Sequence, residues 1–503
     1  MNRFKQIKSL QRPWFAAVIL ALFIGLASAG LQMPGSRPSK GHGAITVSAT
    51  NSCSCGFFTI PFDSIVPGDA PIFGSQQNAD CFGWWEFVSL NWSTKPGAGF
   101  GDPGDMSPVQ WETYITAAAL YPPEGAAPPA WGNSSFLPLP ASVLKLDNRL
   151  ASASKLLTAT SKFDENAIQK FGPDNDGEAA PGSGPNWLGA QNNTNVWYEI
   201  RENQDLYNFV VQNKYYDANN QLAAINKGKP IVFPMGSYPN GPTGAIELKA
   251  AWMEVPDPLN KKWKRYKLSK AALVDPTTGQ YRFTIVALVG LHIIHKTEKQ
   301  PTWVWATFEH IDNVPGSDSS SVDYNFYNPN CQSNTLNVPQ NCLPNGGSSP
   351  VTVTCAANTP PPYYLCKGGP KPVPIQVTRT TAIDANAQAV NDTMQAAIAS
   401  AYPQSVWQYY QLVNVIWSSN PAQNPKRPDT TPITLQAMLP SGTNVANTTM
   451  ETYVQNLTCT NCHQYATIAP TILDTTPNWA ADFSFTIGTA SSPPTKGNVK
   501  KKK

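Results

Sequence analysis

The stretch FTIVALVGLHII occupies residues 283–294 and contains no charged side chain. A strand with one face in the core and one in solvent would carry a polar residue at every second position, and this stretch does not. We therefore expect a central strand that is covered on both faces. A sheet built around such a strand needs partners on its two edges, and the flanking sequence supplies candidates.

The segments around this stretch have the composition of strands. Aromatic and β-branched residues are concentrated in 245–255, 263–274, 280–295, 302–313 and 407–418, and such residues are enriched in sheets. Residues 296–301 are expected to form the hairpin loop between two of these strands. We predict one antiparallel sheet from the five segments.

Helical patterns surround the predicted sheet. We expect short helices at 81–92 and 109–121, a longer one at 196–216 with Asn195 as its N-cap, and an alanine-rich one at 382–401. The 47 prolines predict long loops between these elements. The predicted fold class is α+β, an antiparallel sheet core with flanking short helices and long loops.

The chain is divided here into five parts by composition. They are a leader at 1–29, a loop- and helix-rich region at 30–230, a sheet region at 231–420 with a cysteine-containing insertion at 315–374, a C-terminal segment at 421–487, and a lysine-rich tail at 488–503, expected to be disordered.

The leader predicts export. Four basic residues precede the uncharged run 14–26, which ends in the small residues 27–29, the pattern of a cleaved secretory signal. The remaining chain has no apolar run of the ~20 residues that a membrane-spanning helix needs. Charged residues make up only 14% of the chain and the net charge is +3, so no nucleic-acid partner is expected. We expect a periplasmic or secreted protein without a membrane span after signal cleavage.

The C-terminal segment contains the motif CTNCH at residues 459–463. Two thiols three positions apart lie near one helical turn and can reach two vinyl groups of one porphyrin, and the adjacent imidazole can ligate its iron. A small helical segment should carry the motif, after a helix that begins with a capping box formed by Thr448 and Glu451. A redox-active dithiol, a zinc site and a structural disulfide are the alternative readings.

With this motif the chain resembles the c-type cytochromes. The resemblance implies thioether bonds from Cys459 and Cys462 to one covalent haem c, with His463 as the proximal iron ligand. The stretches GLHIIHKT at 290–297, WVWATFEHIDN at 303–313 and NTTMETYVQ at 447–455 make the chain similar to large exported bacterial cytochrome-c-like proteins.

A sixth iron ligand is expected from the preceding residues, because no Met, His or Cys follows His463 and only Lys496 and the final lysines could ligate from the C-terminal side. The candidates are His292, His295 and His310, while His42 lies in a glycine-rich stretch and is expected to face solvent. Methionine is an alternative distal ligand, from Met438 or Met450, and an open or water-bound iron is a third possibility.

Strand alternation predicts how these histidines face. His292 and His295 are three positions apart and should point to opposite faces. His310 should share a face with Val304, Ala306 and Phe308, and His292 should share one with Val286, Leu288 and Ile294. Both of these histidines are therefore expected to be buried.

The other cysteines predict disulfides in an exported protein. The equal spacings within Cys331–Cys342 and Cys355–Cys366 favour two local disulfides. Cys81 is expected to pair with either Cys53 or Cys55, which leaves one cysteine without an assignment.

Three functions are compatible with these patterns. The first is an exported mono-haem c-type cytochrome that transfers single electrons to and from an unidentified redox partner protein. The second is a haem enzyme that activates peroxide or oxygen at an open iron. The third is a ligand-binding or structural exported protein in which the haem only fastens the C-terminal segment.

Overall fold

The structure is a computed structural model. It describes residues 52–133, 135–136, 138–158, 188–275, 279–316, 323–336, 351–353, 355–359, 365–366, 369–370, 373–419, 421, 445–471 and 479–494. These residues lie in the larger of the two units into which the chain divides, Thr46–Lys503. The signal, His42, Met438 and the last nine residues lie outside the described residues.

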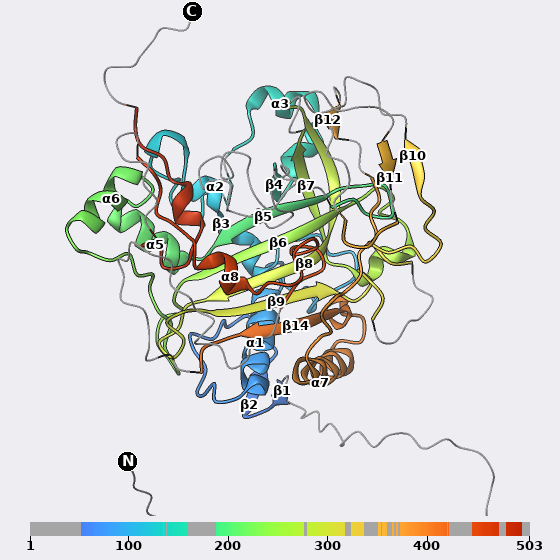
Figure 1. Cartoon of the computed structure of the whole chain (residues 1–503), viewed down its shortest axis with the longest axis horizontal. Coiled ribbons are helices and arrows are strands. Elements are labelled where there is room, and N and C mark those ends of the chain that lie inside the picture. Colours follow the sequence, from blue (N-terminus) through green and yellow to red (C-terminus); the bar gives the residue numbers. More distant parts are fainter. Residues whose placement is uncertain are drawn as a thin grey trace, which may run out of the picture. The chain divides into compact units, whose positions relative to one another are not determined.

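An eight-stranded sheet organises the described residues and confirms the α+β class (Figure 1). Its main path runs β14-β9-β8-β6-β5-β3, with β7 pairing with β8 and β4 with β7. All these pairings are antiparallel except that of β4 with β7. The strands are β3 (Ile115–Thr116), β4 (Lys155–Leu157), β5 (Val196–Glu202), β6 (Ile246–Val255), β7 (Leu268–Val274), β8 (Tyr281–His295), β9 (Val304–His310) and β14 (Tyr410–Ile416).

The predicted central strand is β8, which pairs with β6, β7 and β9. Every residue from 286 to 295 is buried, so the expectation of a strand covered on both faces is confirmed for this part. The hairpin between β8 and β9 is also confirmed, because these consecutive strands are antiparallel neighbours. The five predicted strand segments are thus all represented in one sheet.

A β-bulge in β8 changes which residues share a face. The pairing of β6 with β8 shifts where Ala251 faces Gly290 and Trp252 faces Leu288, so Val289 is the extra residue. Leu288, Leu291 and Ile293 consequently pack in one core cluster, whereas Ile294 packs in another. The prediction that His292 shares a face with Val286 and Leu288 is therefore wrong, because the bulge reverses the alternation between them.

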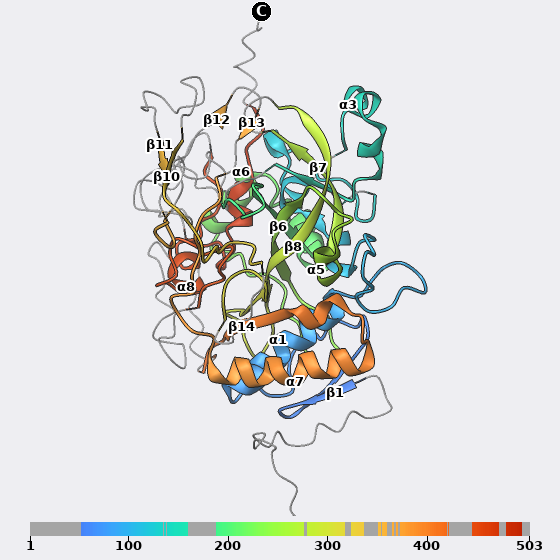
Figure 2. The ribbon, with the colours of Figure 1, turned by 90° about the vertical axis from the view of Figure 1, so that its right-hand side faces the viewer.

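Two helices cover one face of the sheet. Helix α1 (Gln76–Leu90) packs on β9 and β14, and α7 (Ala385–Ala401) packs on α1 and β14 (Figure 2). Both helices were predicted, although α1 begins earlier because the Ser75 side chain accepts a hydrogen bond from the amide of Asn78 and caps it. Helix α1 is almost wholly buried because it lies between the sheet and α7.

Two helix predictions in the N-terminal half are wrong. Residues 196–216 form β5 and then α5 (Gln204–Asn213), because the aromatic and β-branched start pairs with β6 and Asn203 caps the helix after it. Residues 109–121 form a 3₁₀ turn η1 (Gln110–Thr113), β3 and the short α2 (Ala117–Leu120). In both places cross-strand pairing prevails over local helical periodicity.

The remaining elements are short. They are β1 (Ser52–Cys55), β2 (Phe58–Pro61), η2 (Pro123–Gly125), α3 (Ala141–Leu146), η3 (Asn148–Ser152), α6 (Ala218–Asn226), η4 (Lys261–Arg265), β10 (Asn334–Leu336), β11 (Val351–Val353), β12 (Leu365–Cys366), β13 (Gly369–Pro370), η6 (Val406–Tyr409), α8 (Cys459–His463) and η9 (Thr486–Thr489). Among the described residues, none of the helices is both long and apolar enough to cross a membrane.

The disulfides agree with the predictions in part. Cys55 pairs with Cys81, one of the two partners expected, and Cys53 is a buried thiol. Cys331 pairs with Cys355, so the predicted pairings of Cys331 with Cys342 and of Cys355 with Cys366 are wrong. Equal sequence spacing does not determine which cysteines meet, because the two neighbouring strands β10 and β11 bring Cys331 and Cys355 together.

Candidate haem-attachment site

Helix α8 consists of the CTNCH motif itself, and the predicted small helical segment is present. Asn461, between the two cysteines, accepts a hydrogen bond from the amide of Thr458 at 2.8 Å and so closes the first turn. The thiols of Cys459 and Cys462 are both half-buried. The predicted helix before the motif is wrong, since residues 448–457 form turns.

The imidazole of His463 is held by a backbone carbonyl and two aromatic rings. Its Nδ1 lies 2.8 Å from the carbonyl oxygen of Phe483. A carbonyl only accepts hydrogen bonds, so Nδ1 carries the hydrogen and Nε2 carries the lone pair of the neutral ring. The rings of Trp305 and Phe485 lie 4.6 and 5.0 Å from the imidazole, centroid to centroid. This arrangement gives His463 the tautomer that iron ligation at Nε2 requires.

The loop that supplies this carbonyl has an unusual backbone. Asp482 and Phe483 both have positive φ, 50° and 69°, which is rare for a bulky side chain such as phenylalanine. Asp482 forms an ion pair of 2.8 Å with the buried Lys296, and its carbonyl accepts a hydrogen bond from the indole of Trp303. Residues of the β8–β9 hairpin thus hold the loop in the conformation that directs the Phe483 carbonyl at His463.

A small pocket lies beside His463 and Cys459. The sheet contributes His292 and Ile294 from β8 and Trp305 and Ala306 from β9, and Glu451 completes the lining. The Nε2 atom of His292 lies 3.4 Å from a carboxylate oxygen of Glu451. One predicted distal candidate, His292, therefore lies in the same pocket as the motif.

The other predicted distal ligands lie elsewhere. Both ring nitrogens of His295 are occupied at 2.5 Å, by the carboxylate of Glu86 and by the carbonyl of Thr243, and its ring is stacked on Phe82 of α1. His292 and His295 thus face opposite sides of the sheet, as predicted. Met450 is buried in an apolar cluster with Tyr198 and Val289 and is not among the residues that line the pocket.

His310 also has both ring nitrogens in hydrogen bonds. Nε2 lies 3.0 Å from the carbonyl of Arg265, and Nδ1 accepts from the amide of Asp312. Its ring is stacked on Tyr266 at 3.7 Å. Burial lowers the pKa of His310 to about 4, in agreement with a neutral ring. The prediction that His310 is buried is confirmed, but its position is that of a core residue.

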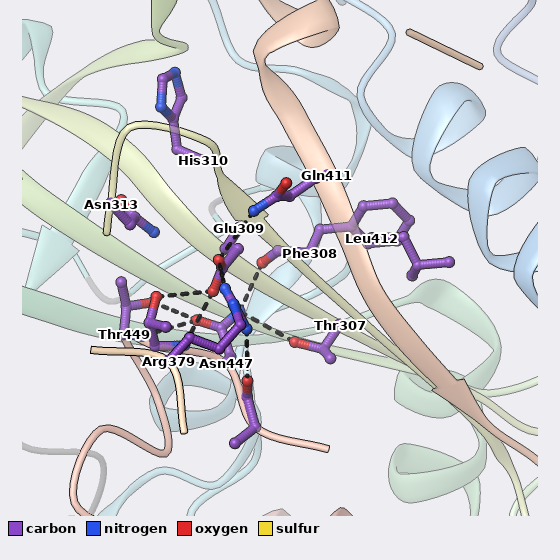
Figure 3. A network of polar contacts seen from close by, with 12 residues as sticks. Thr307, Phe308, Glu309, His310, Asn313, Arg379, Gln411, Leu412, Asn447 and Thr449 are labelled. Atoms are coloured by element: carbon purple, nitrogen blue, oxygen red, sulfur yellow. Dashed lines mark hydrogen bonds and ion pairs between the residues drawn. The ribbon is translucent and has the colours of Figure 1, made fainter. Parts of the chain in front are cut away.

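A polar network anchors the segment before the motif to β9 (Figure 3). Glu309, fully buried, forms an ion pair with Arg379 and accepts hydrogen bonds from the amide and hydroxyl of Thr448. The side chain of Asn447 donates to the hydroxyl of Thr307 and to the carbonyl of Phe308. These bonds fix residues 447–449 against the sheet face that carries His292.

Gly290 allows this close approach. A Cβ atom on residue 290 would lie 2.2 Å from the hydroxyl of Thr449 and 3.1 Å from the side-chain oxygen of Asn447. Only glycine leaves room for the anchored segment to pack directly on β8 at this position.

The donor set fits a covalent haem. Two thiols on one helical turn, an imidazole with its Nδ1 held, and an apolar wall from Ile294 and Trp305 are what c-type attachment needs. The enclosed space has room for about one water molecule, far less than the roughly 300–1,000 Å³ of usual cofactor pockets. A porphyrin bound to Cys459 and Cys462 would therefore require the lining side chains to move apart or would extend beyond the pocket.

Several residues of the site were not predicted as such. Glu451 was assigned to a capping box, but its carboxylate accepts from the amide of Asn447 and lies beside His292. Ile294 was expected to share a face with His292, and both line the pocket, but neither Ile294 nor Trp305 was predicted as part of the site. Phe483 contributes only a backbone carbonyl, for which a sequence carries no signal.

Comparisons with known proteins do not add an identity. The chain matches no protein-family model, no curated protein and no solved structure.

Proposed function

We propose that the protein is an exported mono-haem c-type cytochrome that carries one electron at a time. Cys459 and Cys462 would hold the haem by thioether bonds and His463 would ligate its iron. The observation that carries the proposal is the Nδ1 of His463 held by the Phe483 carbonyl, in a CxxCH helix that borders a pocket. When bound, the haem supplies reversible one-electron chemistry.

The surrounding residues have identifiable roles in this proposal. The carbonyl of Phe483 sets the tautomer and orientation of His463, a second-sphere contact that tunes a ligated metal. The rings of Trp305 and Phe485 pack against the imidazole and restrict its orientation. The Glu309 network holds the segment in place against β9.

Export is part of the proposal. The leader at 1–29 has the pattern of a secretory signal. The disulfides Cys55–Cys81 and Cys331–Cys355 are of a kind that persists in oxidising compartments. The partner would be another one-electron carrier protein outside the cytoplasm.

The test is to produce the full chain in a bacterial host that assembles c-type cytochromes. We expect the mature protein to gain the mass of one haem, and this gain should survive denaturation. The double variant Cys459→Ala/Cys462→Ala should carry no covalent haem, while Cys53→Ala, which alters a buried thiol elsewhere, should carry a full complement. Wild-type protein without covalent haem would refute the proposal.

A second candidate is an enzyme that activates peroxide at an open iron. The pairing of His292 with Glu451 in the pocket favours it, because an imidazole beside a carboxylate can act as a general acid and base. If His292 instead ligates the iron, the ferric protein should be low-spin and resist carbon monoxide.

The spectra of three histidine variants separate these two candidates. With His292 as ligand, His292→Ala should turn the spectrum high-spin and admit carbon monoxide, while His295→Ala and His310→Ala should leave the ligation unchanged. Wild-type protein that is already high-spin and binds carbon monoxide would favour the enzyme.

A further inference from the structure

Two buried glutamates face each other on neighbouring strands of the sheet. Glu202 of β5 and Glu247 of β6 are direct cross-strand partners. Glu202 is 0% exposed and Glu247 is 6% exposed. Two negative charges this close in a low-dielectric interior repel strongly, so the fully ionised pair is a high-energy state.

The two carboxylates accept too few hydrogen bonds to stabilise two buried negative charges. By hydrogen-bond geometry neither carboxylate oxygen of Glu202 has a partner among the described residues, nor does the buried hydroxyl of Tyr121, although the nearby Thr486 hydroxyl lowers the pKa of both groups. Glu247 accepts hydrogen bonds from Ser484 at 2.7 Å and from Thr486 at 3.3 Å. A proton between the two carboxyls would satisfy Glu202 and would remove one of the two charges.

Neighbouring charged and titratable groups raise and lower the pKa values of the two glutamates. Burial raises the pKa of Glu202 well above its ordinary value, and the Glu247 carboxylate raises it further. Burial also raises the pKa of Glu247, while the hydroxyl of Ser484 and the ammonium of Lys249 lower it. Tyr121 stays neutral, since burial and both glutamates raise its pKa. Among the described residues 479–494 of the covering loop the one charged side chain, Asp482, is in an ion pair with Lys296.

The pair borders the candidate haem site. Ser484, which donates to Glu247, directly follows Phe483, whose carbonyl holds His463. Ile294, which lines the pocket, is the cross-strand partner of Glu247 on β8. A change of charge at the haem would therefore act on the pair through buried protein, where screening by salt is weak.

We propose that Glu202 and Glu247 share one proton at neutral pH and that this proton is released or taken up as the attached haem is oxidised or reduced. Loss of one electron to an acceptor protein adds a positive charge, which favours release of the proton to water. Return of one electron from a donor protein restores the proton to the carboxyl pair. The second half of this inference rests on the proposed function, whereas the shared proton does not.

The first arm of the test is infrared spectroscopy of the mature protein as a function of pH. Wild type should show a protonated-carboxyl band at pH 7 that disappears at higher pH. In Glu202→Gln and Glu247→Gln the band should titrate at lower pH or be absent, because the remaining carboxyl no longer faces a like charge. Glu254→Gln is the matched control, since Glu254 is also on β6 but is paired with Arg282 at 2.7 Å.

The second arm is the midpoint potential of the haem as a function of pH. The wild-type potential should fall as pH rises through the titration of the pair, by up to about 59 mV per pH unit for one proton per electron. Both glutamine variants should flatten this slope, and Glu254→Gln should preserve it. A flat wild-type potential, or an unchanged slope in both variants, would overturn the coupling.

The outcomes distinguish this inference from the proposed function. Protein without haem would refute the proposed function, and the infrared arm would still decide whether the pair holds a proton. Wild type without a protonated band at pH 7 would overturn the shared proton. A bound divalent cation detected by elemental analysis, removed by a chelator with loss of thermal stability in wild type but not in Glu202→Gln, would also overturn it.

Discussion

At the scale of single residues, His292 and His310 are both buried imidazoles, but their ring nitrogens have different partners. His310 has its two nitrogens in hydrogen bonds with backbone groups, and one of these bonds, from the amide of Asp312, requires a lone pair on Nδ1. His292 lies in a pocket beside a carboxylate. The first histidine must stay neutral to keep its contacts, while the second faces the Glu451 carboxylate in the pocket.

The neutral state of His310 predicts a dependence of stability on pH. Its pKa is about 4 in the folded protein and about 6.5 in the unfolded chain, so the unfolded state binds the proton more tightly. This contribution to stability is present above pH 6.5 and is lost as the pH falls towards 4, by roughly 3 kcal/mol in total.

Urea unfolding measured between pH 7 and pH 4 checks this prediction. His310→Gln removes the titrating group and should show a smaller loss of unfolding free energy over the same range than wild type. Equal losses in the two proteins would contradict the assignment of this pH dependence to His310.

At the scale of elements, the bulge in β8 and the glycine beside it determine how the motif segment meets the sheet. The extra residue Val289 sets His292 and Ile294 on the face that receives residues 447–455. Gly290 then allows Thr449 and Asn447 to pack against the strand. Two adjacent residues of β8 therefore act together: Val289 sets the orientation of His292, and Gly290 leaves space for the segment that completes the pocket.

Gly290→Ala is expected to loosen this segment. The added Cβ would lie 2.2 Å from the Thr449 hydroxyl, which is itself held by the side chain of Asn447 at 2.7 Å. Overpacking of this kind typically costs about 1–3 kcal/mol. Amide hydrogen exchange over residues 447–455 should be faster than in wild type, with little change in α1 and α7.

A double variant tests whether the clash with Thr449 causes this loosening. Gly290→Ala/Thr449→Ala removes the obstructing hydroxyl and should recover part of the lost protection. If the double variant exchanges as fast as the single variant, the clash with Thr449 is not the reason.

At the scale of the whole molecule, a buried charge cluster ties distant parts of the chain together. Lys155 of β4 forms ion pairs with Glu112 of η1 and Glu199 of β5, and Glu112 also contacts Lys267 at 3.3 Å. Arg201 pairs with Glu199 at 2.8 Å. Although burial raises the pKa of Glu112, the ammonium groups of Lys155 and Lys267 hold it at about 2. The Glu112 carboxylate therefore stays ionised at neutral pH.

Lys155→Met should destabilise the protein by about 3–5 kcal/mol, because it removes the buried cation that Glu112 and Glu199 share and leaves each carboxylate with a single cationic partner. It also removes the contact of the ammonium with the Trp252 ring at 4.1 Å. Chemical unfolding at pH 7 measures the loss. Lys145→Met, an exposed position on α3, is the control and should lie within about 0.5 kcal/mol of wild type. A similar small change in Lys155→Met would refute a stabilising role of the cluster.

The sequence alone determined the local features of this protein. The apolar stretch at 283–294 predicted the central strand, and the composition of its neighbours predicted their pairing in one antiparallel sheet. The CTNCH spacing predicted a small helix that carries both cysteines and His463. These features depend on residues close in sequence, whose propensities and periodicity are visible without the fold.

Only the tertiary structure decided which distant residues meet. Three histidines were equivalent candidates by sequence, but a single extra residue in β8 places one of them beside the motif. The pairing of Cys331 with Cys355 and the approach of the Phe483 carbonyl to His463 likewise follow from the path of the chain. The reason is physical, because a bulge reverses strand alternation and a backbone carbonyl acts independently of its side chain.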